Sequence, residues 1–96
     1  MSGLTIFYLP GCPYCANARR ALAELCAGRE EYAAVPVEWI DESEEYELAE
    51  SYDYYYVPSA YLGREKLFEA RPLERYAACR EKLRAALDRA LAQRED

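Results

Sequence analysis

Residues 4–15, LTIFYLPGCPYC, join a short apolar run to a pair of cysteines separated by two residues. The run over residues 4–9 is rich in β-branched and aromatic side chains and stops at Pro10-Gly11, which is typical of a buried strand followed by a turn. Beyond the second cysteine, apolar residues recur at helical spacing as far as Cys26, and Gly28 is a plausible stop. The predicted framework is therefore a strand, a tight loop and a helix that begins with Cys-x-x-Cys.

The position of the two cysteines at the start of this helix predicts redox chemistry. A helix N-terminus carries unpaired N–H groups and about half a positive charge, which stabilise a thiolate at Cys12. Pro13 suits the first helical position, where its missing N–H is not needed. Cys15 lies one turn further on the same side, from where it can attack a mixed disulfide formed at Cys12. Arg19 is expected to lie too far along the helix to contact Cys12 directly.

Composition narrows the class of protein. The 96 residues allow one domain, 1–96, with one modest core. No apolar run approaches the roughly 20 residues of a membrane span, and we see no signal-peptide pattern. A net charge of −6 argues against nucleic acid as a partner, because phosphate binding needs a basic face. Four cysteines without a dense, loop-rich framework suggest a reducing cytoplasm. The protein is expected to be a monomer.

The rest of the chain predicts two further helices and three further strands. Residues 29–34 are a polar connection, and Pro72 is expected to open the last helix. The predicted elements are a strand over 35–40, a helix from a capping box at Asp41 and Glu44 to about Ser51, strands over 59–62 and 66–70 joined by a turn at 63–65, and a long final helix. The fold class is α/β, in the order β-α-β-α-β-β-α, with a four-stranded mixed sheet and three helices.

The cysteines of the motif also allow a metal-binding interpretation. A Cys-x-x-Cys pair can be half of a zinc site, but such a site needs two more ligands at matched spacing. The chain has no histidine, and Cys26 and Cys79 are single residues on apolar helix faces. Redox chemistry is therefore favoured and no metal is expected. Cys26 and Cys79 are predicted to pack in the core, because a free cysteine behaves as a small hydrophobe.

Taken together, Cys12-Pro13-Tyr14-Cys15 after the first strand and Val57-Pro58 before a later strand resemble the dithiol glutaredoxins of the thioredoxin superfamily. The resemblance implies that the bond before Pro58 is cis and lies beside the dithiol. It also implies that the Val57 backbone offers strand-like hydrogen bonds to a bound substrate. In the family, the tyrosine at the Tyr14 position flanks the reactive sulfur and bound glutathione.

Two stretches depart from that family. Glutaredoxins usually carry a lysine shortly before the motif, where this chain has residues 8–11, YLPG. They also usually have Gly-Gly and a nearby Asp after the fourth strand, where this chain has residues 69–72, EARP. Both features bind glutathione in the family. Arg71 is a candidate to replace one of these contacts by pairing with a glutathione carboxylate.

The expected function is thiol–disulfide exchange on protein or glutathione mixed disulfides, or on other small-molecule disulfides. No tightly bound cofactor is expected. Glutathione as a co-substrate, or a flavoprotein reductase, would restore the dithiol. Three alternatives stay open: a thioredoxin-like reductase that ignores glutathione, an iron–sulfur carrier with a cluster held between two chains, and a non-catalytic redox-sensing module. In the last case the tyrosines around residues 54–56 would form the interface.

Overall fold

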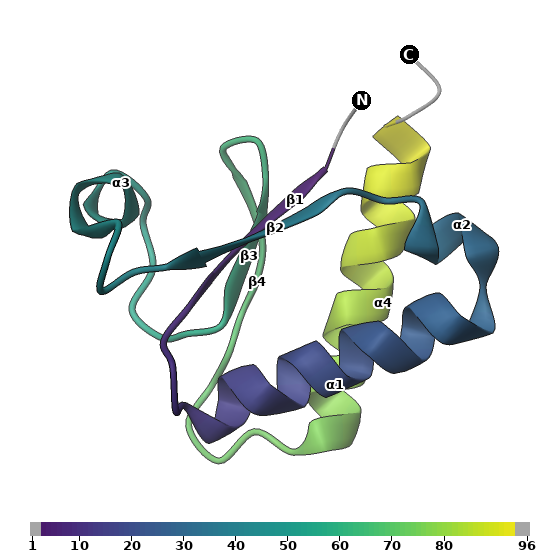
Figure 1. Cartoon of the computed structure of the whole chain (residues 1–96), viewed down its shortest axis with the longest axis horizontal. Helices are drawn as coiled ribbons and strands as arrows, with labels where there is room; N and C mark the ends of the chain where they lie inside the picture. Colours follow the sequence, from purple (N-terminus) through teal and green to yellow (C-terminus); the bar gives the residue numbers. More distant parts are fainter. Residues whose placement is uncertain (1–2, 94–96) are drawn as a thin grey trace.

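The computed structural model describes residues 3–93, which form a mixed sheet with helices on both faces (Figure 1). The central strand β1 (Leu4–Tyr8) pairs in parallel with β2 (Val37–Asp41) and antiparallel with β3 (Ser59–Leu62). Strand β4 (Glu65–Glu69) pairs antiparallel with β3 and completes the order β2-β1-β3-β4. Figure 1 shows α1 (Pro13–Gly28), α2 (Glu30–Ala33) and α4 (Tyr76–Gln93) on one side of the sheet and α3 (Tyr46–Glu50) on the other.

The alternation of side chains along β1 divides the core into two clusters. Leu4 and Ile6 lie on the face covered by α1 and α4, where they meet buried residues such as Leu83 and Leu87. Phe7 points to the opposite face and packs there with Ile40, Ala49 and Tyr61. Because successive strand residues face opposite sides, a nearly continuous apolar run is what a strand buried on both faces requires.

The predicted fold class is confirmed, while the predicted number of helices is corrected from three to four. The segment expected to be a polar connection contains the single-turn helix α2. Tyr32 in this helix is only 2% exposed, and its hydroxyl donates to Asp88 Oδ1 of α4 at 2.7 Å. The buried ring and its tertiary hydrogen bond hold this short turn in place.

The predicted start of the acidic helix was wrong. Asp41 is the last residue of β2, and its Oδ1 accepts hydrogen bonds from the backbone N–H of Ser43 at 2.9 Å and from its hydroxyl at 2.6 Å. This local turn delays the helix to Tyr46, because an Asp side chain can satisfy backbone groups outside a helix as well as at its cap. Strand β2 begins at Val37, after Pro36, two residues later than predicted.

The predicted start of the last helix was wrong as well. It begins at Tyr76, four residues after Pro72. Leu73 has a φ of 64°, in the left-handed region that helices do not contain. Its backbone N–H donates to the Tyr14 hydroxyl at 2.8 Å. This hydrogen bond to α1 holds Leu73 outside the helix, which therefore begins later than predicted. None of the helices within residues 3–93 has the length and apolar character needed to cross a membrane.

Candidate functional site

The cysteine pair lies where β1 turns into α1. Gly11 has a φ of 80°, which suits a residue without a Cβ, and it lets the chain reverse directly before the helix. Cys12 is the N-cap in an extended conformation, and Pro13 occupies the first helical turn. The backbone carbonyl of Cys12 accepts the first helical hydrogen bond, from Ala16 N–H at 3.0 Å. Its side chain makes no capping hydrogen bond, so the sulfur is not tied to the helix amides.

The two sulfurs lie in different environments. Cys12 is partly exposed, whereas Cys15 is only 3% exposed, and both are free thiols. Burial raises the pKa of the Cys15 thiol to about 12, against a smaller opposing contribution from a Leu9 backbone hydrogen bond. A hydrogen bond from the Cys15 thiol to the Cys12 sulfur, the nearby charge of Cys12 and the Glu42 carboxylate raise it further. Cys15 is therefore held as a protonated thiol behind the more accessible Cys12.

A shallow depression of about 250 Å³ surrounds the dithiol. Its lining comes from the end of β1, the loop and the first two turns of α1. Arg19 also lines it, although no hydrogen bond joins Arg19 to Cys12 among the described residues. The Arg19 guanidinium carbon lies 4.7 Å from the ring centre of Tyr8 and 4.3 Å from that of Trp39. Helical side chains lean toward the N-terminus, and this tilt brings the guanidinium back toward the cysteines.

The Val57-Pro58 segment lies at the same end of the sheet as the dithiol. Pairing of Phe7 with Ser59 puts the residues before β3 next to the loop that follows β1. The Val57-Pro58 peptide bond is cis, as the resemblance implied. Pro58 lines a small cavity together with Tyr14, the residue between the two cysteines. The structure thus brings Pro13, Tyr14 and Pro58 into one neighbourhood with Cys12 and Cys15.

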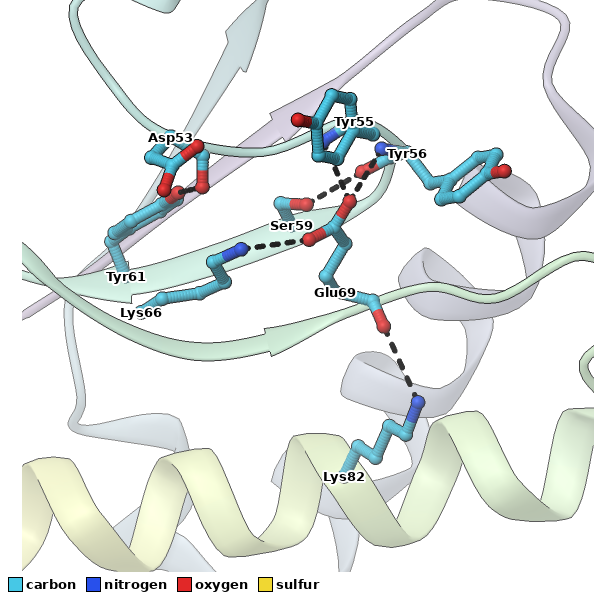
Figure 2. A network of polar contacts seen from close by, with 8 residues as sticks. All are labelled: Asp53, Tyr55, Tyr56, Ser59, Tyr61, Lys66, Glu69 and Lys82. Atoms are coloured by element: carbon cyan, nitrogen blue, oxygen red, sulfur yellow. Dashed lines mark hydrogen bonds and ion pairs between the residues drawn. The ribbon is translucent and has the colours of Figure 1, made fainter.

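The backbone groups of the loop before Pro58 differ in their hydrogen bonding. The backbone N–H groups of Tyr55 and Tyr56 both donate to Glu69 Oε2, at 2.6 and 2.7 Å, and the Tyr56 carbonyl accepts from the Ser59 hydroxyl at 2.5 Å (Figure 2). Val57, which follows, takes part in none of the hydrogen bonds found among residues 3–93. Its N–H and C=O are therefore without a hydrogen-bond partner among the described residues, and the residue itself is half-buried.

The tyrosines of residues 52–56 divide into two groups. Tyr52 and Tyr54 pack against Phe7, with ring centres 4.8 and 5.2 Å away, and belong to the second core cluster. The Tyr54 hydroxyl also donates to Glu42 Oε1 at 2.5 Å. Tyr55 and Tyr56 instead are 88% and 52% exposed. Of the tyrosines around residues 54–56 that were considered as an interface, only Tyr55 and Tyr56 are therefore largely exposed.

Arg71 lies apart from the depression around Cys12. It lines a groove of about 880 Å³ between β4, the start of α4 and the exposed Tyr55 and Tyr56. Its backbone N–H donates to Glu74 Oε1 at 2.8 Å. The Leu73 N–H is already bonded to Tyr14, so two amides of this loop have partners within the chain. The Arg71 side chain is exposed.

The remaining two cysteines pack in the first core cluster, and Cys79 also lines the small cavity of Tyr14 and Pro58. Cys79 is 7% exposed in the core beneath α4, and Cys26 packs against the same cluster, as predicted. Burial raises the pKa of the Cys79 thiol to about 11. Within residues 3–93, no group of three or more His, Cys, Asp and Glu side chains is arranged to hold a metal ion.

A pair of cysteines at a helix start, beside a cis-proline loop and on a mixed sheet of order β2-β1-β3-β4, is the arrangement of the thioredoxin fold. The Glutaredoxin family model matches residues 4–67, a range that includes both cysteines and Val57-Pro58. The chain therefore belongs to the glutaredoxin family. No curated protein matches it.

Proposed function

We propose that the protein reduces disulfides by dithiol exchange, with Cys12 as the nucleophile and Cys15 as the resolving thiol. The observation that carries the proposal is the asymmetry of the pair: Cys12 is accessible at the helix start, while Cys15 is buried and stays protonated. Thiolate is the reactive form in exchange, so this asymmetry selects which sulfur attacks first.

The exchange proceeds in two balanced steps. The Cys12 thiolate attacks one sulfur of the substrate disulfide, the S–S bond breaks, and one substrate thiolate leaves and takes up a proton. Cys15 then loses its proton, attacks the Cys12 sulfur and expels the second substrate thiol. The protein ends as a disulfide, and the substrate has gained two electrons and two protons. Two of the contributions that raise the pKa of Cys15 come from Cys12, and they weaken once that sulfur is bonded to substrate.

Substrate binding is assigned to the backbone beside the dithiol. The unpaired N–H and C=O of Val57 can accept an extended peptide as one more strand, which would set the peptide's disulfide over Cys12. Pro13, Tyr14 and Pro58 shape the surface that the substrate covers. The acceptors in this proposal are protein or small-molecule disulfides. Two molecules of glutathione then restore the dithiol in two exchanges: the first opens the protein disulfide to a mixed disulfide, and the second releases glutathione disulfide.

A coupled assay tests the source of electrons. The protein, a peptide mixed disulfide and NADPH are combined either with glutathione and glutathione reductase or with thioredoxin reductase. We expect NADPH oxidation in the glutathione arm, dependent on the protein. Turnover in neither arm would contradict the proposed activity.

One observation favours a glutathione-independent reductase as the second candidate. The loop after β4 has two of its amides, those of Arg71 and Leu73, bonded inside the chain. These amides are not free to hold a glutathione carboxylate. Turnover only in the thioredoxin-reductase arm would select this candidate over the first.

Arg71 is the remaining candidate for a glutathione contact, and its contribution can be measured. Replacement by alanine removes a charge-assisted contact, which is expected to weaken glutathione binding about tenfold. The measurement is a thermal-shift titration of the wild type, Arg71→Ala and Arg75→Ala with glutathione. Arg75 lines the same groove four residues later and serves as the matched control. An equal response of all three proteins would remove Arg71 from the site.

A further inference from the structure

Glu69 makes more contacts with the loop before Pro58 than any other side chain drawn in Figure 2. Its Oε2 accepts from two successive amides, those of Tyr55 and Tyr56, at 2.6 and 2.7 Å. Its Oε1 accepts from Lys66 Nζ at 2.8 Å, and its backbone carbonyl accepts from Lys82 Nζ at 3.3 Å. The side chain of Glu69 is only 18% exposed.

A bulge in β4 aims this carboxylate at the loop. Tyr61 pairs with Lys66 and Ala60 pairs with Phe68, so Leu67 is an extra residue on β4. One extra residue reverses the alternation of faces, which puts Lys66 and Glu69 on the same side of the sheet. That side carries the core cluster of Phe7 and Tyr61, and the loop before Pro58 lies over it.

The carboxylate is held in its charged form. Burial alone would raise the pKa of Glu69, but hydrogen bonds from Lys66 and from the amides of Tyr56 and Tyr55 outweigh burial and keep the pKa below its usual value. Charged acceptors form the stronger class of hydrogen bond. Two strong bonds on consecutive amides fix the orientation of the peptide units that lead into Val57.

The loop is thereby anchored from two sides. On the side of the dithiol, Tyr54 stacks on Phe7 and bonds Glu42, a carboxylate whose charge acts on Cys15. On the side of β4, Glu69 holds the next two residues. Directly before β3, the Pro58 carbonyl accepts a hydrogen bond from Ala70 N–H at 2.9 Å. Between these anchors, the Val57 amide and carbonyl have no hydrogen-bond partner in the part of the chain that the structure describes.

We propose that Glu69 is a positioning residue for substrate recognition: its carboxylate orients the Tyr55–Val57 backbone so that Val57 can pair with the main chain of a peptide disulfide. The inference rests on the proposed function, since it concerns how that substrate is held. Glu69 touches neither the cysteines nor the disulfide. Its effect should therefore depend on whether the substrate has a peptide backbone.

The experiment compares three disulfides with one set of reduced proteins. The substrates are a cysteine peptide joined to 2-mercaptoethanol, the same peptide N-methylated on both sides of the cysteine, and bis(2-hydroxyethyl) disulfide, which has no peptide bond. The proteins are the wild type, Glu69→Gln, Glu69→Ala and Glu65→Gln. Glu65 lies on the same edge strand and pairs with Arg89 at 2.8 Å, so its variant removes an equal charge away from the loop.

The measured quantity is the second-order rate constant for each combination of protein and disulfide. Thermal unfolding of each variant checks that it is folded. The wild type and Glu65→Gln should prefer the unmodified peptide over the methylated one by about tenfold, the value of one or two lost backbone hydrogen bonds. Glu69→Ala should reduce this preference to less than about twofold. Glu69→Gln should fall between them, because its amide oxygen can still accept from both N–H groups. The rate constants for bis(2-hydroxyethyl) disulfide should be nearly the same for the wild type and the three variants.

A merely structural role would lower the melting temperature of the Glu69 variants and leave the peptide preference unchanged, and that result overturns the inference. If Glu69→Ala does not fold, an unchanged preference in Glu69→Gln overturns it equally. A wild type without preference also overturns it. If the wild type reduces none of the three disulfides, the proposed function itself fails, and this outcome is distinct from the others.

Discussion

Replacing Cys12 by serine is expected to lower the rate of disulfide reduction by at least about a thousandfold. A serine hydroxyl stays protonated at neutral pH and does not attack sulfur, and loss of a nucleophile that acts with a second group removes nearly the whole rate. The fold should persist, because Cys12 is a helix cap whose side chain makes no capping hydrogen bond.

Cys15→Ser should give a different result from Cys12→Ser. The first attack survives, so one equivalent of substrate thiol is released in a burst, and turnover then stops at the mixed disulfide. Cys26→Ala is the matched control, since Cys26 lies on the same helix but packs against the core. It should keep the wild-type rate. A Cys12→Ser variant that still turned over would show that another sulfur attacks.

Iodoacetamide should alkylate Cys12 much faster than Cys15. A free cysteine has a pKa near 8.5, whereas that of Cys15 is about 12. At pH 7 the thiolate fraction of Cys15 is therefore more than about a thousandfold below that of a free thiol, and burial slows access further. Because a raised pKa keeps the thiol protonated, its labelling rate should rise about tenfold per pH unit up to pH 11.

Digestion and mass spectrometry after timed labelling of the reduced protein would measure these rates. Cys12 should be modified first, and Cys15 should remain unmodified at neutral pH. Cys79 is an internal reference, because it is also buried and its pKa is raised to about 11. Labelling of Cys15 at the rate of Cys12 would contradict the proposed order of attack.

The parts of the fold that depend on neighbours in the chain could be predicted from sequence. The helix start at Cys12-Pro13 follows from local capping rules, and the structure has it at the same residues. The starts of α3 and α4 could not be predicted in this way. Asp41 pairs with Tyr8 in the sheet, and Leu73 is held in a left-handed conformation next to the Tyr14 hydroxyl. The start of α4 depends on a contact between residues far apart in the sequence, and the start of α3 depends on the pairing of Asp41 in the sheet together with its local turn at Ser43.

The candidate site likewise contains residues that could be predicted from sequence and residues that could not. Cys12, Cys15 and Val57-Pro58 carry a recognisable motif, whereas Glu69 carries none. Strict alternation along residues 65–69 would put Lys66 and Glu69 on opposite faces of the sheet. The extra residue in β4 reverses this, and a bulge is fixed by pairing with β3 rather than by the strand's own sequence. A similar limit applies to Arg19, whose position depends on the rings of Tyr8 and Trp39.

The most direct test of the account is to map the intermediate itself. Cys15→Ser is reacted with the peptide mixed disulfide, digested without reductant, and analysed by mass spectrometry for the residue that carries the adduct. The account predicts one adduct per chain, on Cys12, with release of one equivalent of thiol. An adduct on Cys26 or Cys79, or no adduct at all, would contradict it.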